Sequence, residues 1–307
     1  MRKNRIRVGI VVVLAVNTIG MAACQSKTSE EALQETEKPV VTQQSKETEP
    51  PKEEKKAIIQ SSGVNLNDRF AAPTGYTKDA YKKDSFGAFV RNYSMQKDKA
   101  KVHLYDGREK GNQSSAAAVF SMKVGDRDLQ QCADSVIRMY AEYFYETKQY
   151  DHMNFHFVDG FECSYKKWSE GYRVAFSNEK ASWKKSTGKD TSYESFEKYL
   201  TVVFAYASTI SLEKECKEIK LKDVKIGDVF INAGSPGHVV MVVDVCTNQE
   251  GKKAVLLAQG YMPAQEFHVI TNPRHSEDPW YYEDEIKSPF QTAEYTFTDS
   301  VCKRPQY

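Results

Sequence analysis

The segment from Gln25 to about Ser62 most constrains what this 307-residue chain can fold into, because it has almost no large apolar side chain. Residues 25–61 hold eight Glu and six Lys, and most of the rest are Thr, Gln, Ser and Pro. Such a segment cannot bury enough surface to offset its chain entropy. We therefore predict a disordered tether over residues 24–62 and one globular α+β domain over residues 63–307, since no second linker and no repeat follows.

The N-terminus has the layout of a secretory signal peptide, with cations first, then an apolar run over residues 8–19, then small residues. The run is too short, and too interrupted by Asn17 and Thr18, to stay in a bilayer as a spanning helix. Met21-Ala22-Ala23-Cys24 resembles the lipobox of bacterial lipoproteins. That resemblance implies a signal peptide over residues 1–23, a lipid at Cys24, and a chain anchored to the extracytoplasmic face of the cell membrane. The alternative is an ordinary signal peptide followed by a chance cysteine.

Charge and cysteine content narrow the possible partners. The formal net charge of +1 gives no overall electrostatic footprint for nucleic acid, so we expect no nucleic-acid partner. No C-x-x-C spacing exists, so a structural zinc site has little support, and we predict no cofactor and no metal. Outside Cys24 the number of cysteines is odd, which leaves at least one thiol unpaired within the chain. These cysteines are Cys132, Cys163, Cys216, Cys246 and Cys302.

A helix is predicted around Cys132. Asp128 followed three residues later by Gln131 has the pattern of an N-cap with a capping box. Apolar residues then recur at helical spacing up to Phe144, with one buried face. Cys132 falls in the predicted first turn, where backbone N–H groups and the helix dipole favour a thiolate. The alternative for Cys132 is a small buried core residue.

His238 and Gln259 are expected at the same end of a β-sheet. Residues 229–231 and 239–245 are rich in β-branched side chains and are predicted as buried strands, with His238 opening the second one. The turn at residues 248–251 predicts a hairpin with the next apolar run, which brings Gln259 back toward His238. A near-neutral imidazole there suits a general base, and Gln259 suits a residue that orients it. A hydrogen-bonded turn histidine and an edge-strand glutamine remain the alternatives.

Three stretches carry a resemblance to known families: DLQQCADSVIRMYAEYFY, GDVFINAGSPGHVVMVVDV and LLAQGYMPAQEFHVI. They resemble signature blocks of a bacterial lipoprotein family catalogued as domain of unknown function 4846, over most of the chain after the tether. More distantly, the order of a helix-borne cysteine, a Gly-His strand and a polar residue on the next strand resembles the papain-like NlpC/P60 and CHAP cell-wall hydrolases. This resemblance implies a papain-like fold, in which a mainly antiparallel sheet packs on a long helix that carries the cysteine.

Carried over residue by residue, the resemblance implies Cys132 as nucleophile, His238 as general base and Gln259 as the orienting residue. The first hypothesis is therefore a cysteine amidase or peptidase, with peptidoglycan peptides as the expected substrate because of the predicted location. The second is a non-catalytic envelope-binding domain on the same scaffold. Its groove would be lined by aromatic side chains, although such residues more often belong to the core. The candidates are Trp168, Tyr172, Trp183, Trp280, Tyr281 and Tyr282.

His152 and His156 are candidate ligands of a metal site. Their four-residue spacing would place both side chains on one face of a helix. The residues around His156 alternate as a strand does, however, and strand geometry does not align those two rings. We therefore predict no metal there.

Overall fold

The computed structural model describes residues 57–178 and 180–307, and the predicted signal peptide, Cys24 and most of the predicted tether lie outside this part of the chain. The first described contacts of the backbone join Ile58 to Ala71 and Ile59 to Phe70. Within the described residues, no helix has both the length and the apolar character needed to cross a bilayer.

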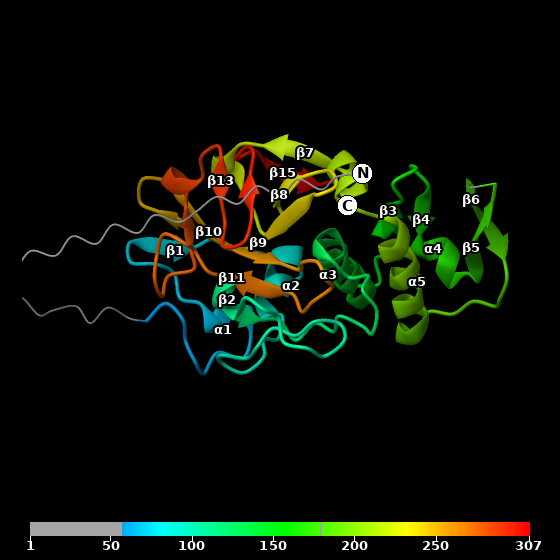
Figure 1. Ribbon diagram of the computed structural model, residues 1–307, viewed down its shortest axis with the longest axis horizontal. Coiled ribbons are helices and arrows are strands. Elements are labelled where there is room, and N and C mark those ends of the chain that lie inside the picture. The colour runs from blue at the N-terminus through cyan, green and yellow to red at the C-terminus, as the bar shows by residue number, and fades with distance from the viewer. Residues whose placement is uncertain (1–56, 179) are drawn as a thin grey trace, which may run out of the picture. The chain divides into compact units, whose positions relative to one another are not determined.

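A nine-stranded sheet, in which every recorded strand pair is antiparallel, forms the centre of the fold (Figure 1). Its main path runs β2-β11-β10-β9-β8-β15-β7, while β1 pairs with β9 and β12 pairs with β10. The strands are β1 (Tyr76–Lys78), β2 (Ala116–Val119), β7 (Cys216–Ile219), β8 (Val229–Asn232), β9 (His238–Asn248), β10 (Lys253–Gln259), β11 (His268–Ile270), β12 (Tyr281–Tyr282) and β15 (Cys302–Pro305).

The hairpin β9–β10 is the longest pairing of this sheet, and almost all of its residues are buried. Nine of the eleven residues of β9 and six of the seven of β10 are buried, so both faces of this hairpin are covered and the strands read as nearly continuous apolar runs. The register joins Lys253 to Thr247 at the turn end, and it shifts at a bulge between Leu256 and Leu257. The predicted turn at residues 248–251 closes this hairpin, with Gly251 at φ +81°.

The helices are short: α1 (Leu66–Arg69), α2 (Phe86–Asn92), α3 (Cys132–Glu146), α4 (Tyr165–Ser169), α5 (Tyr193–Tyr206) and α6 (Thr209–Lys214). α5 and α6 follow each other closely but are separate helices, because Ser208 caps a new helix. Three small hairpins stand outside the main sheet: β3–β4 (Asn154–His156, Glu162–Ser164), β5–β6 (Tyr172–Ser177, Lys180–Lys185) and β13–β14 (Phe290–Gln291, Thr296–Phe297).

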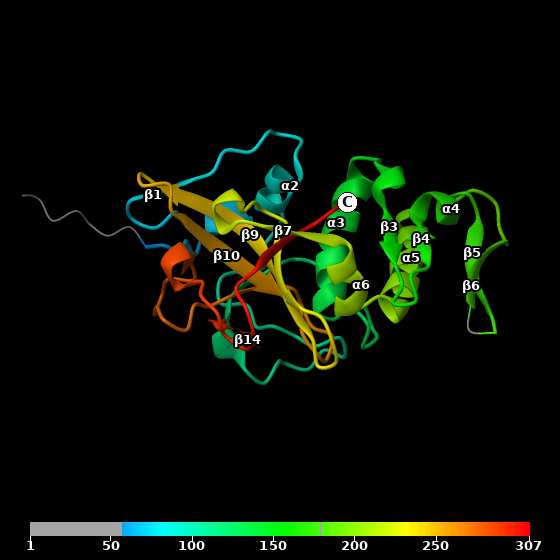
Figure 2. The same cartoon turned by 90° about the horizontal axis from the view of Figure 1, so that it is seen from above.

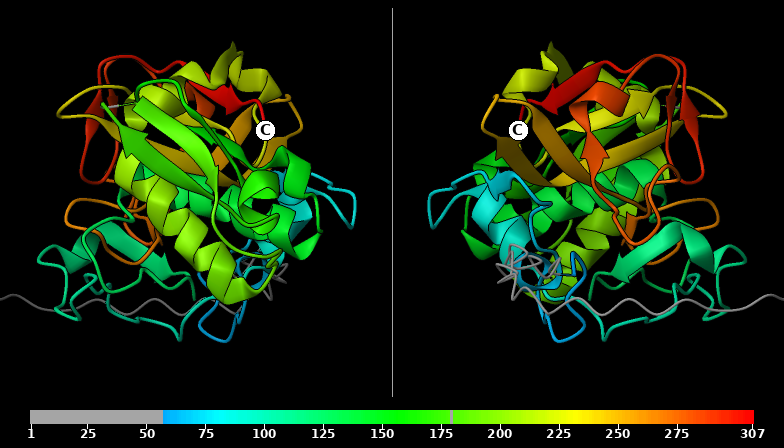
Figure 3. Two further views of the ribbon diagram at one scale, coloured as in Figure 1. Left: turned by 90° about the vertical axis from the view of Figure 1, so that its right-hand side faces the viewer. Right: turned by 90° about the vertical axis from the view of Figure 1, so that its left-hand side faces the viewer.

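The segment from β3 to α5 lies on the far side of α3 from the nine-stranded sheet (Figures 1 and 2). The left view of Figure 3 shows the β5–β6 hairpin standing in front of α5. α4 packs against both α5 and β5, and α5 also contacts α3. This segment therefore adds its own small layer beside α3.

The predicted papain-like fold is wrong. The described residues are mostly antiparallel β-structure with short helices, and the longest of these helices, α3, has 15 residues. Cys132 is the first residue of α3. The N-terminal strands β1 and β2 join the same sheet as the C-terminal third by pairing with β9 and β11. Long-range pairing of this kind leaves no local signal.

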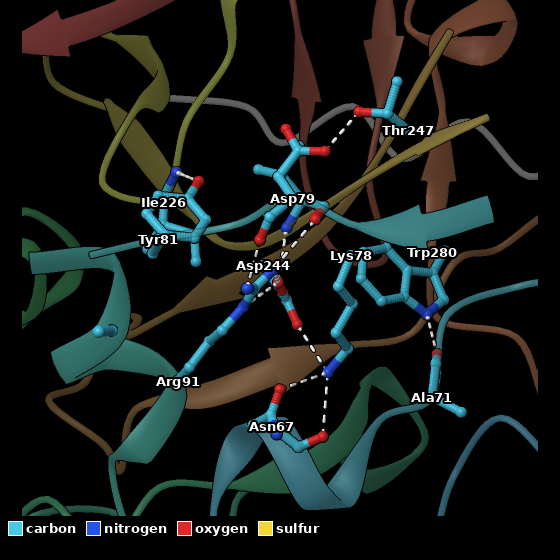
Figure 4. A network of polar contacts seen from close by, with 12 residues as sticks. Asn67, Ala71, Lys78, Asp79, Tyr81, Arg91, Ile226, Asp244, Thr247 and Trp280 are labelled. Atoms are coloured by element: carbon cyan, nitrogen blue, oxygen red, sulfur yellow. Dashed lines mark hydrogen bonds and ion pairs between the residues drawn. The ribbon is translucent and has the colours of Figure 1, made fainter. Parts of the chain in front are cut away.

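A buried ion-pair network joins the N-terminal elements to the sheet (Figure 4). Asp244 of β9 has no exposed side-chain surface, and it accepts hydrogen bonds of 2.8 and 2.6 Å from Arg91 of α2. Lys78 of β1 lies 3.0 Å from the other carboxylate oxygen. Arg91 also donates to the backbone oxygen of Asp79 at 2.5 Å. A buried carboxylate is tolerated only with such partners, so this network fixes α2 and β1 on β9.

Candidate active site

Cys132 begins α3, but the helix start differs from the prediction. Gln131, not Asp128, precedes the first helical residue, and the side chain of Asp134 accepts from the Gln131 backbone N–H at 3.1 Å. Asp128 instead accepts from the backbone N–H of Ala264 at 2.7 Å, which ties the approach to α3 to the loop after β10. Cys132 is thus at the N-terminal end of the helix, as predicted, through a different cap.

The Cys132 thiol is neutral in this environment rather than ionised. Burial, together with the nearby carboxyl of Asp134, raises its pKa to about 11. Backbone N–H groups of Ala133 and Val239 lower the pKa of the thiol but do not outweigh its burial. The helix position alone favours a thiolate, but burial outweighs it, as the alternative of a small buried core residue implies.

His238 is the first residue of β9, and Gln259 is the last residue of β10. Because the two strands are antiparallel neighbours, these ends meet, and His238 Nε2 lies 2.8 Å from Gln259 Oε1. Burial lowers the pKa of His238 to about 4, against the opposing effect of the Gln259 hydrogen bond. The imidazole is therefore neutral at neutral pH.

Two contacts bring Cys132 to the same place as His238 and Gln259. α3 packs against β9, and the backbone N–H of Val239, adjacent to His238 in the chain, lies near enough to the Cys132 sulfur to lower the pKa of the thiol. On the other side, Gly260 packs so closely against α3 that a Cβ there would lie 2.2 Å from Ser135 Oγ and 2.8 Å from Gln131 O. The first turn of α3 thus packs over the start of β9 and the end of β10, which places Cys132 near His238 and Gln259.

Aromatic rings cover this cluster. The centroid of the His238 ring lies 4.7 Å from that of Tyr261 and 4.9 Å from that of Tyr295. Cys132 is 7% exposed, His238 3% and Gln259 0%. None of five hollows on the described surface is lined by these three residues. The neighbouring turns at residues 235–236 and 262–263 are exposed.

Sequence reasoning missed Glu294 and Lys110. Glu294, in the turn between β13 and β14, accepts from Gln259 Nε2 at 2.7 Å and from Lys110 Nζ at 2.5 Å. The short strands on either side of Glu294 have no distinctive pattern, and 184 residues separate it from Lys110. The feature that distinguishes the pair is the burial of the Lys110 side chain, which is 7% exposed. The sequence does not show that burial.

The six aromatic residues that were candidates for a binding groove do not lie together. Trp168, Trp280 and Tyr281 are buried, and the two tryptophans donate to backbone oxygens of Ser195 and Ala71. The six aromatic residues divide between the β5–β6 region and β12, and therefore do not line one groove. All five cysteines of the described residues are free thiols.

The two histidines of the rival metal site lie on different elements. His156 is on β3 and its Nδ1 lies 2.7 Å from Glu215 Oε1, while His152 ends a short 3-10 turn and stacks on Phe144. Within the described residues no cluster of three or more His, Cys, Asp or Glu side chains is placed to hold a metal ion.

Comparison with protein-family models gives a match over residues 66–304, to the domain of unknown function 4846. The chain belongs to this family. The family resemblance expected from the three sequence blocks is thereby confirmed, and the match covers the whole cluster around Cys132, together with Lys110 and Glu294. Neither the curated proteins nor the solved structures gave a match.

Proposed function

We propose that this member of the 4846 family is a membrane-anchored extracytoplasmic lipoprotein that hydrolyses amide bonds of cell-wall peptides with Cys132 as nucleophile. The observation that carries the proposal is the packing of the first turn of α3, which begins with Cys132, against the ends of β9 and β10 that hold the His238–Gln259 pair. The order of the three residues along the chain also resembles that of NlpC/P60 and CHAP hydrolases. A nucleophile, a base and an orienting group in one cluster are the parts that amide hydrolysis requires.

The neutral states of thiol and imidazole define the mechanism. His238, with its pKa near 4, is unprotonated at neutral pH and accepts the thiol proton as the Cys132 sulfur attacks the amide carbonyl. The C–N bond then breaks, the proton passes to the leaving amine, and a thioester remains on Cys132. Water, deprotonated by the same imidazole, hydrolyses the thioester to a carboxylic acid and restores the thiol.

Backbone donors support the transition state in this proposal. The N–H groups of Ala133 and Val239 both lower the pKa of the Cys132 thiol, at the N-terminal end of α3, and therefore lie near its sulfur. Fixed N–H groups of this kind stabilise the negative oxygen that forms on an attacked carbonyl. Access requires the exposed turns at residues 235–236 and 262–263 to move aside, because the resting cluster is buried.

The substrate class follows from the proposed location. A lipid on Cys24 and a tether up to residue 62 would hold the domain at the outer face of the membrane, next to the cell wall. The peptides of peptidoglycan are the amide-bearing polymer at that place. The predicted signal peptide and lipobox support this location.

The test compares the full-length protein in detergent with its Cys132→Ala variant on purified peptidoglycan. We expect new peptide termini with the unaltered protein, found by mass spectrometry of the released fragments, and none with Cys132→Ala. The matched control is Cys216→Ala, a half-buried thiol outside the cluster that is expected to retain full release. Equal release by the unaltered protein and Cys132→Ala would refute the proposal.

The burial of the cluster favours a second candidate, a non-catalytic envelope-binding domain. A thiol with a raised pKa and little exposure is typical of a core cysteine. This candidate predicts that the unaltered protein and Cys132→Ala bind peptidoglycan fragments equally and that neither releases new termini.

A further inference from the structure

A line of hydrogen bonds leads from the His238 ring into a buried ion pair. His238 Nε2 lies 2.8 Å from Gln259 Oε1, Gln259 Nε2 donates to Glu294 Oε2 at 2.7 Å, and Lys110 Nζ donates to Glu294 Oε1 at 2.5 Å. Lys110 also donates to Ser115 Oγ at 2.7 Å. The line thus crosses from β9 and β10 to the β13–β14 turn and to the segment before β2.

The chemistry of donors and acceptors fixes the orientation of every group in this line. Burial alone would raise the pKa of Glu294, but the hydrogen bond and the positive charge of Lys110 lower it, so Glu294 is a carboxylate. A carboxylate only accepts, so Gln259 must turn its NH₂ group toward Glu294 and its oxygen toward His238. His238 Nε2 must then carry the proton of the neutral ring. The remaining nitrogen, Nδ1, is unprotonated and is the only basic atom of the ring.

We propose that Glu294, held by Lys110, is a positioning residue that fixes the Gln259 amide and thereby keeps Nδ1 of His238 free to accept a proton. This inference rests on the proposed function for its catalytic meaning, but the state of the ring can be measured separately. Without the carboxylate, the Gln259 amide can turn over and offer its NH₂ group to His238. Nε2 then accepts, the proton moves to Nδ1, and the ring no longer has a base at that position.

His268 provides an internal comparison within the same cluster. It pairs with Gln259 across β10 and β11, and its Nδ1 donates to the backbone oxygen of Glu266 at 2.9 Å. Its own bare Nε2 lies 4.0 Å from Glu294 Oε2 and has no hydrogen-bond partner. A backbone oxygen sets the tautomer of His268, so loss of Glu294 should leave that ring unchanged while the His238 ring changes.

The experiment records the imidazole nitrogen signals of the full-length protein with ¹⁵N-labelled histidine, and assigns them with His238→Gln and His268→Gln. We expect the Nε2–H form of His238 in the unaltered protein and a substantial Nδ1–H population in Glu294→Gln. Glu294→Asp, which keeps the charge, should restore Nε2–H. The control is Glu266→Gln, a half-buried carboxylate that bonds Gln96 and His103 outside the line and should leave the His238 signals unchanged.

Activity on peptidoglycan is the second readout. Glu294→Gln should lower kcat by at least about tenfold with little change in KM, because an incorrect tautomer removes the base without altering substrate contacts. An unchanged Nε2–H form in folded Glu294→Gln would overturn the inference, and Lys110→Met provides the same test if Glu294→Gln does not fold. A tautomer change in a protein that shows no peptidoglycan cleavage would support the positioning role and refute the proposed function.

Discussion

The neutral state of two buried histidines has a consequence for stability. Burial lowers the pKa of both His238 and His268 to about 4, well below the ordinary value of 6.5. As the pH falls from 6.5 to 4, the unfolded chain takes up these protons before the folded chain does. The contribution of each ring to stability is therefore complete above pH 6.5 and is lost between pH 6.5 and 4, by up to roughly 3 kcal/mol per ring.

The measurement is urea unfolding at pH 7 and pH 4.5. We expect the free energy of unfolding to fall less on acidification in His268→Gln than in the unaltered protein. His152→Gln removes an exposed histidine and should give the full decrease. An equal decrease in all three proteins would show that the buried ring of His268 is not held neutral.

Individual site residues were predictable from the sequence only where a local pattern marks them. His238 and Gln259 stand at the ends of apolar β runs beside glycines, and a hairpin turn relates the two positions. No local pattern identifies Glu294, because its partners Lys110 and Gln259 are far from it in the sequence. The ionisation state of Cys132 was also not predictable, because the pKa of its thiol depends on burial by neighbouring elements.

Among the elements, the contact between α3 and β10 determines the geometry of the cluster. The absence of a side chain at Gly260 lets the end of β10 approach Ser135 and Gln131 of the first turn region. The turn at residues 248–251 correctly predicted the β9–β10 hairpin. The N-cap of α3 was predicted at Asp128, whereas the residue before the helix is Gln131. Asp128 has the residue type of an N-cap, yet its carboxylate binds the distant Ala264 backbone, so a tertiary contact overrides the local pattern.

Replacing Gly260 with Ala should therefore displace the first turn of α3. The new Cβ would lie 2.8 Å from the backbone oxygen of Gln131, which a side-chain rotation cannot relieve. We expect a loss of about 1–3 kcal/mol in unfolding free energy and a decrease in peptidoglycan release of about tenfold or more. The control Gly111→Ala meets nothing within 4 Å. Full activity and stability in Gly260→Ala would contradict the close approach.

At the scale of the whole molecule, the sequence indicated a largely antiparallel sheet but not its extent. Pairing of β1 with β9 and of β2 with β11 brings the N-terminal part into the same sheet as the C-terminal third. The Asp244 network then fixes β1 and α2 in place through charges that lie far apart in the chain. Analogy with papain-like enzymes supplied the wrong architecture, because an order of three residues along a chain does not determine a fold.

The most direct test of the account is to trap the thioester on Cys132. The full-length protein is mixed with peptidoglycan peptides and quenched in acid, and digestion followed by mass spectrometry locates any acyl group. The account predicts an adduct on the peptide that contains Cys132 in the unaltered protein and no adduct in Cys132→Ala. Peptide cleavage by the unaltered protein without any adduct at Cys132, and undiminished in Cys132→Ala, would contradict it.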